Sequence, residues 1–198
     1  PASEEIIDFH HGVEDVKARK LAIIGDPELR YREDPVRMLR AIRLASKLGL
    51  EITPAAKKPI AGLSKLLGNI PSARLFDEMM KLLLSGRAWD CLMALHAEGL
   101  HRELFPVLDL VLARPQARQF LKLALDNTDA RLAQDKPVSA GFLFAALLWH
   151  EVEADWQARQ ACGQYPVPAL VDAMSGVEEI VEKRLAIPKR YGVAMKEI

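Results

Sequence analysis

The sequence predicts an all-α protein, a helical array of short antiparallel helices. Three observations support this class. Apolar residues recur every three or four positions along most of the chain, Gly and Pro interrupt the pattern, and the connections are short. Half of the 198 residues are apolar and about a quarter are charged, as in globular proteins, so one or two domains with a core are expected.

The first clear helix is predicted from Pro35 to Gly49. Asp34 can cap its N-terminus, Pro35 suits the first helical position, and Gly49 is a stop signal. Its apolar residues share one face and its arginines another, because the helical period is 3.6 residues. The apolar set is Met38, Leu39, Ile42 and Ala45, and the basic set is Arg37, Arg40 and Arg43.

The later helices follow from the same periodicity and from their Gly and Pro boundaries. Pro59 is expected to bend the second helix, and Phe105-Pro106 to interrupt the chain. The predicted ranges are 54–67, 72–85, 87–98, 107–112, 115–132, 139–153, 154–163 and 168–186.

The N-terminal segment Ile6–His10 is predicted as a lone strand that ends in a turn at Gly12. A single strand cannot satisfy its ladder hydrogen bonds. We therefore expect it either to pair with a sheet outside this sequence or not to be a strand here.

Composition and charge exclude several classes of protein. The net charge is zero, although residues 17–47 carry nine Lys and Arg against four Asp and Glu, a segment that could bind phosphate or simply be solvated. No apolar run reaches the length of a membrane span. The two cysteines are far apart, so no zinc site or disulfide is expected and a reducing cytoplasm fits.

The histidines predict no metal site. His10 and His11 are adjacent, so on a strand they would face opposite sides, and their role stays open. His96 and His101 flank Gly99 and are expected at the surface or at helix ends.

One segment is specific enough to indicate a family. Residues 30–43, RYREDPVRMLRAIR, resemble the Glu-Asp-x-x-Arg motif of the class II nucleotidyltransferases, which comprise the CCA-adding enzymes and bacterial poly(A) polymerases. The segments 8–16, 24–28 and 71–83 and Leu104-Phe105-Pro106 resemble family motifs in the same order. His10-His11-Gly12 departs from the family pattern, which has Gly-Gly at this place.

Residues 31–40, 142–146 and 185–190 are closest to the poly(A) polymerase branch. The resemblance implies three regions: a remnant of a catalytic head domain with its linker (1–27), a neck that recognises the nucleotide base (28–112) and an RNA-binding body (113–198). The Asp-x-Asp carboxylates of the head are absent from the sequence. We therefore expect Mg²⁺ to bind to a head domain outside this chain, and the chain alone to be inactive.

The resemblance assigns nucleotide binding to Asp34 and Arg37, which together could read the edge of a base. Arg40 and Arg43 could orient Asp34 or meet phosphate, and Arg32 is a weaker candidate. Capping by Asp34 and solvated arginines are the simpler alternatives. Glu33, Arg74 and Glu78 are expected to support the pocket, although Arg74 and Glu78 could also form an intrahelical ion pair. A basic cluster could contact RNA or be solvated; it consists of Lys183, Arg184, Lys189 and Arg190.

Three functions remain open. The first is adenylyl transfer from ATP to RNA 3′ ends, which serves polyadenylation, RNA processing and decay. The second is CCA addition to tRNA, which differs by the use of CTP. The third is a helical scaffold for a protein partner, which would have the same composition.

Overall fold

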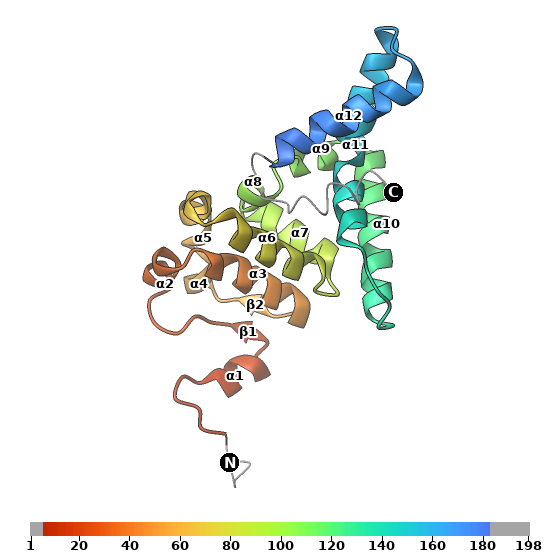
Figure 1. The fold of residues 1–198 in the computed structure, drawn as a ribbon. Coiled ribbons are helices and arrows are strands. Elements are labelled where there is room, and N and C mark those ends of the chain that lie inside the picture. Colours follow the sequence, from red (N-terminus) through yellow and green to blue (C-terminus); the bar gives the residue numbers. More distant parts are fainter. Residues whose placement is uncertain (1–5, 183–198) are drawn as a thin grey trace.

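The computed structural model describes residues 6–182 and is built almost entirely of helices, which confirms the all-α prediction. Figure 1 shows a packed group of short helices, with a long helix upright beside it and a helical hairpin that projects beyond it. The N-terminal helix lies at the opposite end of the molecule. Within the described residues, no helix is both long enough and apolar enough to cross a membrane.

Residues 12–113, which comprise the predicted neck and the linker before it, contain most of the short elements. Two-residue strands pair in parallel, with Lys20 opposite Glu51 and Leu21 opposite Ile52. The elements are α1 (Gly12–Lys17), β1 (Lys20–Leu21), α2 (Pro27–Glu33), α3 (Val36–Leu48), β2 (Glu51–Ile52), α4 (Pro54–Lys57), α5 (Ile60–Leu63), the 3₁₀ helix η1 (Ser64–Asn69), α6 (Ser72–Leu83), α7 (Ala88–Ala97), α8 (His101–Leu104) and α9 (Leu108–Ala113).

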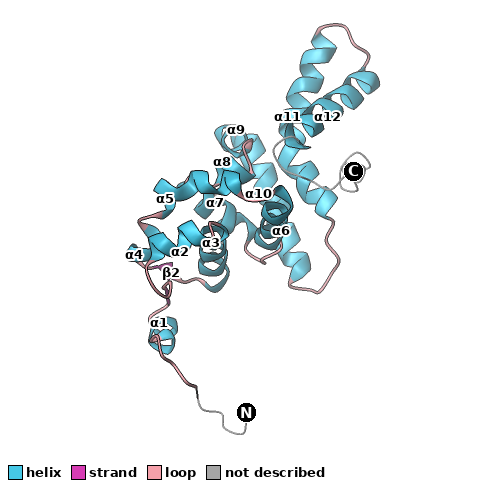
Figure 2. Ribbon diagram, turned by 60° about the vertical axis from the view of Figure 1, so that its left-hand side comes forward, coloured by secondary structure: helices cyan, strands magenta, loops and turns pink. Residues whose placement is uncertain are grey.

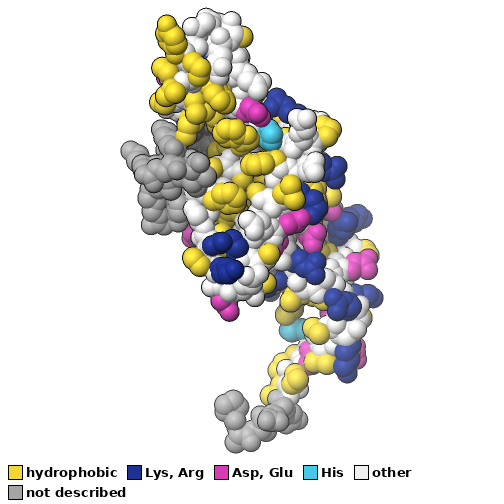
Figure 3. Space-filling view, turned by 90° about the vertical axis from the view of Figure 1, so that its right-hand side faces the viewer, with side chains coloured by type: hydrophobic (Ala, Val, Ile, Leu, Met, Phe, Trp, Pro, Cys, Tyr) yellow, Lys and Arg dark blue, Asp and Glu magenta, His cyan; other side chains and the backbone are white. Residues whose placement is uncertain are grey.

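The described residues of the predicted body contain three longer helices, and α11 and α12 form the projecting hairpin (Figure 2). They are α10 (Pro115–Leu132), α11 (Ala140–Ala161) and α12 (Pro166–Glu182). On the face that carries these helices, apolar side chains gather over the upper part, and charged side chains mix with them further down (Figure 3).

In the part of the chain that the structure describes, one apolar core extends from α2 to α12. Its largest fully buried side chains include Tyr31, Phe105 and Phe144. The Tyr31 hydroxyl donates a 2.9 Å hydrogen bond to the carbonyl of Ala56, so this polar group is satisfied although it is buried. Burial raises the pKa of Tyr31 to about 12. The contact fixes α2 against α4 next to the arginine-rich face of α3.

Ile6–His10 do not form a strand, so of the two alternatives left open for this segment the structure shows the second. The backbone N–H groups of Gly12 and Val13 donate to the Asp8 carboxylate at 2.9 and 2.8 Å, which turns the chain into α1 instead of extending it. These bonds, that of Val13 first, lower the pKa of Asp8. The strands that do form are β1 and β2, and the Arg19 side chain donates to the carbonyls of Leu48 and Gly49 beside them.

Other boundaries also differ from prediction. Helix α11 (Ala140–Ala161) is continuous where two helices, 139–153 and 154–163, were predicted, because no Gly or Pro follows Gly141 within it. Helix α12 begins at Pro166, two residues before its predicted start. Helix α2 was missed, although Asp26 caps it by accepting from the Leu29 N–H at 2.9 Å and Pro27 is its first residue. The predicted bend at Pro59 is confirmed as a break between α4 and α5.

Candidate functional site

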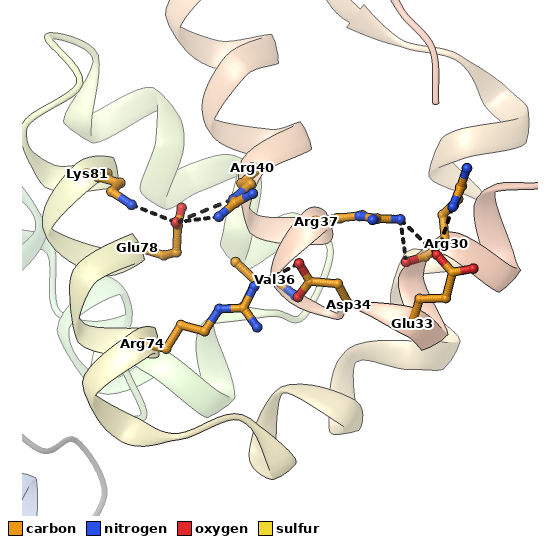
Figure 4. A network of polar contacts seen from close by, with 9 residues as sticks. All are labelled: Arg30, Glu33, Asp34, Val36, Arg37, Arg40, Arg74, Glu78 and Lys81. Carbon is orange, nitrogen blue, oxygen red and sulfur yellow. Dashed lines mark hydrogen bonds and ion pairs between the residues drawn. The ribbon is translucent and has the colours of Figure 1, made fainter. Parts of the chain in front are cut away.

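The residues singled out in the sequence meet where α2, α3 and α6 come together (Figure 4). Asp34 has an extended backbone and joins α2 directly to α3. The buried side chains of Val36, Met38 and Leu39 fix α3 against the core, which turns its arginines toward α2 and α6. The site therefore depends on helix packing and not on a flexible loop.

Both carboxylate oxygens of Asp34 have partners. Oδ1 accepts from the N–H of Val36, the first residue of α3, at 3.3 Å, and Oδ2 accepts from Arg74 Nη2 at 2.8 Å; the N-cap residue of α3 is Pro35 and not Asp34 as predicted. The side chain is only 19% exposed. Each oxygen of a carboxylate can accept more than one hydrogen bond, so these contacts hold Asp34 in place without using all of its acceptor capacity.

Arg37 is held by α2. Its Nη1 donates to Glu33 at 3.2 Å and to the carbonyl of Arg30 at 3.4 Å. Glu33 also accepts from Arg30 at 3.0 Å, and the Arg30 hydrogen bond, followed by the influence of Arg37, lowers the pKa of Glu33. Since these bonds use Nη1 alone, the rest of the Arg37 guanidinium has no partner among the described residues.

Glu78 is the buried centre of a second set of contacts. Its side chain is 3% exposed, and Oε1 accepts from Lys81 at 2.8 Å and from Arg40 Nη2 at 3.3 Å. Oε2 is buried and has no partner among the described residues. The intrahelical Arg74–Glu78 pair, which the spacing allowed, does not form, because Arg74 reaches across to Asp34 while Glu78 lies against α3.

Positive charge is in excess in this network. Five cationic side chains face three carboxylates, so two positive charges are uncompensated; the cations are Arg30, Arg37, Arg40, Arg74 and Lys81, and the carboxylates are Glu33, Asp34 and Glu78. Arg37, Arg40 and Arg74 are each roughly two-fifths exposed and can donate further hydrogen bonds. Guanidinium groups in this arrangement are suited to phosphate oxygens and to the acceptor edge of a base.

Two predicted arginines lie outside these contacts. Arg32 is exposed and donates to Glu28 one turn earlier on α2, at 2.7 Å. Arg43 is half-buried, and its Nε has no partner among the described residues. The predicted RNA contacts Lys183, Arg184, Lys189 and Arg190 lie outside the described residues.

Sequence reasoning missed two members of the network, Arg30 and Lys81. A signal was present for both, because each lies three residues from a carboxylate that it contacts in the structure, Glu33 and Glu78.

The carboxylates of this site do not fit a Mg²⁺ ion. Mg²⁺ binds carboxylate oxygens together with water and substrate phosphates. Here Glu33, Asp34 and Glu78 are each paired with at least one cationic side chain, and the net charge is positive. The site can therefore bind an anion or a base edge, but it is not built as a magnesium centre.

Comparison with protein families matches residues 49–112 to a family model described as "Probable RNA and SrmB- binding site of polymerase A". The matched segment begins at the end of α3 and ends in α9. It therefore includes Arg74, Glu78 and Lys81, whereas Asp34 and Arg37 precede it.

Several curated proteins are similar over the whole chain. Poly(A) polymerase I of Escherichia coli O6:H1 is 39% identical over 96% of the chain, and that of Haemophilus influenzae is 36% identical over 100%. The chain spans 42% and 45% of the lengths of these two proteins. A CCA-adding enzyme of Bacillus licheniformis is 40% identical over 52% of the chain, which covers 26% of that enzyme.

The fold is similar to that of a solved tRNA-processing enzyme with CTP. The TM-score is 0.51 at 16% identity, and the match covers 91% of this chain and 60% of the other. At this identity the match supports the helical fold alone.

Proposed function

We propose that this chain, which belongs to the class II nucleotidyltransferase family of poly(A) polymerases and CCA-adding enzymes, forms the nucleotide- and RNA-binding part of a polynucleotide adenylyltransferase. The reaction of the whole enzyme joins AMP from ATP to the 3′-hydroxyl of an RNA and releases pyrophosphate. It would serve polyadenylation, RNA processing and decay in the cytoplasm.

The observation that carries this proposal is the fixed arrangement of Asp34 and Arg37. Asp34 can accept a hydrogen bond from the exocyclic amine of adenine, and Arg37 can donate to a ring nitrogen. The contacts of Asp34 with Arg74 and of Arg37 with Glu33 hold the two side chains before a nucleotide arrives. Two such groups can select a base without a nucleic-acid template.

The surplus positive charge supports binding of the triphosphate. Arg40 and Arg74 are partly exposed, and the network carries two more positive than negative charges. Arg43 and Arg32 extend the arginine-rich region of α2 and α3. Phosphate oxygens pair well with guanidinium groups, so we assign the triphosphate to this side of the site.

We assign RNA to residues 49–112, which match the RNA-binding family model, in addition to the body helices within 113–198 predicted from the sequence. Lys183, Arg184, Lys189 and Arg190 stay candidates for further contacts with the RNA backbone. We place the RNA 3′ end beside the nucleotide because the two must react with each other.

The carboxylates that bind catalytic Mg²⁺ are assigned to residues outside this chain, in a head domain. Divalent ions stabilise charge on the attacking and leaving oxygens in this class of reaction. The carboxylates of the neck are paired with Arg and Lys side chains and so are not arranged to bind such ions. The chain alone is therefore expected to bind nucleotide and RNA but not to polymerise.

CCA addition to tRNA is the second candidate, because CCA-adding enzymes match half of the chain at similar identity. The two activities differ in the use of CTP. A tailing assay on the product of the whole reading frame distinguishes them, since a poly(A) polymerase adds A alone and a CCA-adding enzyme also adds C.

The first test is binding of ATP to the chain, measured by calorimetry, with the variants Asp34→Asn and Arg37→Lys. Both keep the approximate shape of the side chain, and Asn can still accept from the Val36 N–H. We expect at least about tenfold weaker binding in each, because a hydrogen bond to a charged group contributes about 1.5–3 kcal/mol. Arg159→Ala, in the Asp155–Arg159 pair of α11, is the matched control and should bind ATP normally. Unchanged affinity in both neck variants would refute the assignment.

A further inference from the structure

A cluster of metal-ligating side chains lies at the corner formed by α7, α8 and α9, apart from the nucleotide network. His96 is in the last turn of α7, His101 is the first residue of α8, and Asp109 is in the first turn of α9. Gly99, with a φ of +72°, lets the chain reverse between the two histidines. Three separate elements thus bring these side chains together.

The potential ligand atoms converge on one oxygen. His96 Nε2 lies 2.9 Å and His101 Nε2 lies 3.0 Å from the same atom, Oδ1 of Asp109. All three atoms lie within 4.8 Å of one another, and the imidazole centroids are 4.6 Å apart. In the described part of the chain this is the only group of three His, Cys, Asp or Glu side chains that is placed to share an ion.

His101 supplies the second observation that indicates a ligand. Its side chain is 3% exposed, so of the two expected positions, the surface or a helix end, His101 takes the helix end. Its Nε2 is close to Asp109, yet the two atoms do not have the geometry of a hydrogen bond, and neither ring nitrogen has a hydrogen-bond partner among the described residues. A buried imidazole without a hydrogen bond is costly, and a bound cation would remove part of that cost.

The distances and charges suit a divalent transition metal. In a tetrahedral site with bonds of about 2.0–2.1 Å, neighbouring ligand atoms are about 3.3 Å apart, so the two 2.9–3.0 Å separations need only a small expansion. Metal binding requires imidazole in its neutral form, so the three side chains would offer the cation one negative charge in total.

We propose that His96, His101 and Asp109 bind a divalent cation of the zinc class. Imidazole nitrogen and carboxylate oxygen are common zinc ligands, and water would complete the tetrahedron from the solvent side, where His96 and Asp109 are about half exposed. The ion would tie together α7, α8 and α9, which lie within the segment that matches the RNA-binding family model. This proposal does not depend on the nucleotide assigned to Asp34.

The test is titration of the metal-free chain with Zn²⁺ by calorimetry, and with Co²⁺ by its visible absorption. We expect one Zn²⁺ per chain and the intense bands of four-coordinate Co²⁺. His96→Ala and Asp109→Asn, both at partly exposed positions, should weaken binding by more than about a hundredfold, since loss of an outer partner alone costs about 10–100-fold. A rise in melting temperature with Zn²⁺ should occur in the wild type and not in His96→Ala.

Two controls address the remaining histidines. The double variant His10→Ala/His11→Ala removes the exposed adjacent pair, and His150→Gln removes a histidine that contacts Glu153 and the ring of Phe120. Both should bind Zn²⁺ as the wild type does. If binding is lost in the His10/His11 variant, or if the wild type binds no more tightly than His96→Ala, the cluster is only a pair of histidine–carboxylate contacts and the proposal is wrong.

Discussion

The neck and the body use charged side chains differently. Around Asp34, ion pairs connect residues 38 and 40 positions apart, Arg40 with Glu78 and Arg74 with Asp34. In the described part of the body, the short ion pairs lie within single helices at spacings of three or four residues, and the two that cross between helices are 3.7 Å long.

This difference separates two uses of charge. Exposed pairs within one helix contribute little and are screened by water. A buried carboxylate that holds cations from two helices fixes the position of those cations, because a half-satisfied buried charge is costly. In the neck the protein therefore places arginines at fixed positions, as a binding site requires, while the body uses charge mainly at its surface.

The largest effect is expected from Glu78→Ala. The substitution removes the acceptor for Arg40 and Lys81 and leaves a small cavity, so the free energy of unfolding should fall by about 2 kcal/mol. It should not fall by the full 3–5 kcal/mol of a broken buried pair, because Arg40 and Lys81 are half exposed and can reach water. Urea denaturation of the chain measures the change.

A double-mutant cycle of Arg40 and Glu78 sharpens this test. If Glu78 positions Arg40, the coupling free energy should be about 1 kcal/mol or more, because contacting residues in one network are not additive. Additive effects of Arg40→Ala and Glu78→Ala would contradict the distinction between neck and body.

A smaller effect is expected where the two regions join. Asp129 of α10 accepts from the Ala88 N–H at 2.9 Å and so caps α7 from outside that helix. Asp129→Ala should lower the free energy of unfolding by about 1 kcal/mol, as for other lost caps. A change close to zero in urea denaturation would mean that this contact does not help to join neck and body.

Asp129 is also expected to make the free energy of unfolding depend on pH. Burial raises the pKa of Asp129 above its usual 3.8, so the folded state binds this proton more tightly than the unfolded state. Ionisation of Asp129 therefore costs stability, and the cost appears as pH rises from about 4 through the raised pKa. Relative to wild type, Asp129→Asn should become more stable over this window. If the difference in free energy of unfolding between Asp129→Asn and the wild type did not change with pH, the raised pKa of Asp129 would be refuted.

Part of this structure could be predicted from sequence because its signals are local. Asp34, Pro35 and Gly49 define α3, and the period of its arginines places Arg37 and Arg40 on one face. The lone strand was considered because residue propensity favours an extended backbone at Ile6–His10. In the structure the Asp8 carboxylate accepts from the following backbone N–H groups instead, which turns the chain.

The spacing of residues in the sequence did not predict which side chains contact each other in the site. Spacing suggested Arg74 with Glu78, but helix packing brings Arg74 to Asp34 and Glu78 to Arg40, and local rules cannot predict contacts that span about 40 residues. The burial of His101 was not predicted for the same reason. It depends on how α7, α8 and α9 pack together, which local sequence patterns do not predict.

The smallest effect is expected in the body. Lys122 and Asp126 are about half exposed and lie four residues apart on α10. A double-mutant cycle with Lys122→Ala and Asp126→Ala should give a coupling of about 0.5 kcal/mol or less, and salt should reduce it, because solvent and ions screen exposed charges. Urea denaturation at low and high salt measures it. A coupling as large as that of Arg40 with Glu78 would show that an exposed pair within one helix is as strong as a pair between helices. Ion pairing would then not distinguish the neck network from the body.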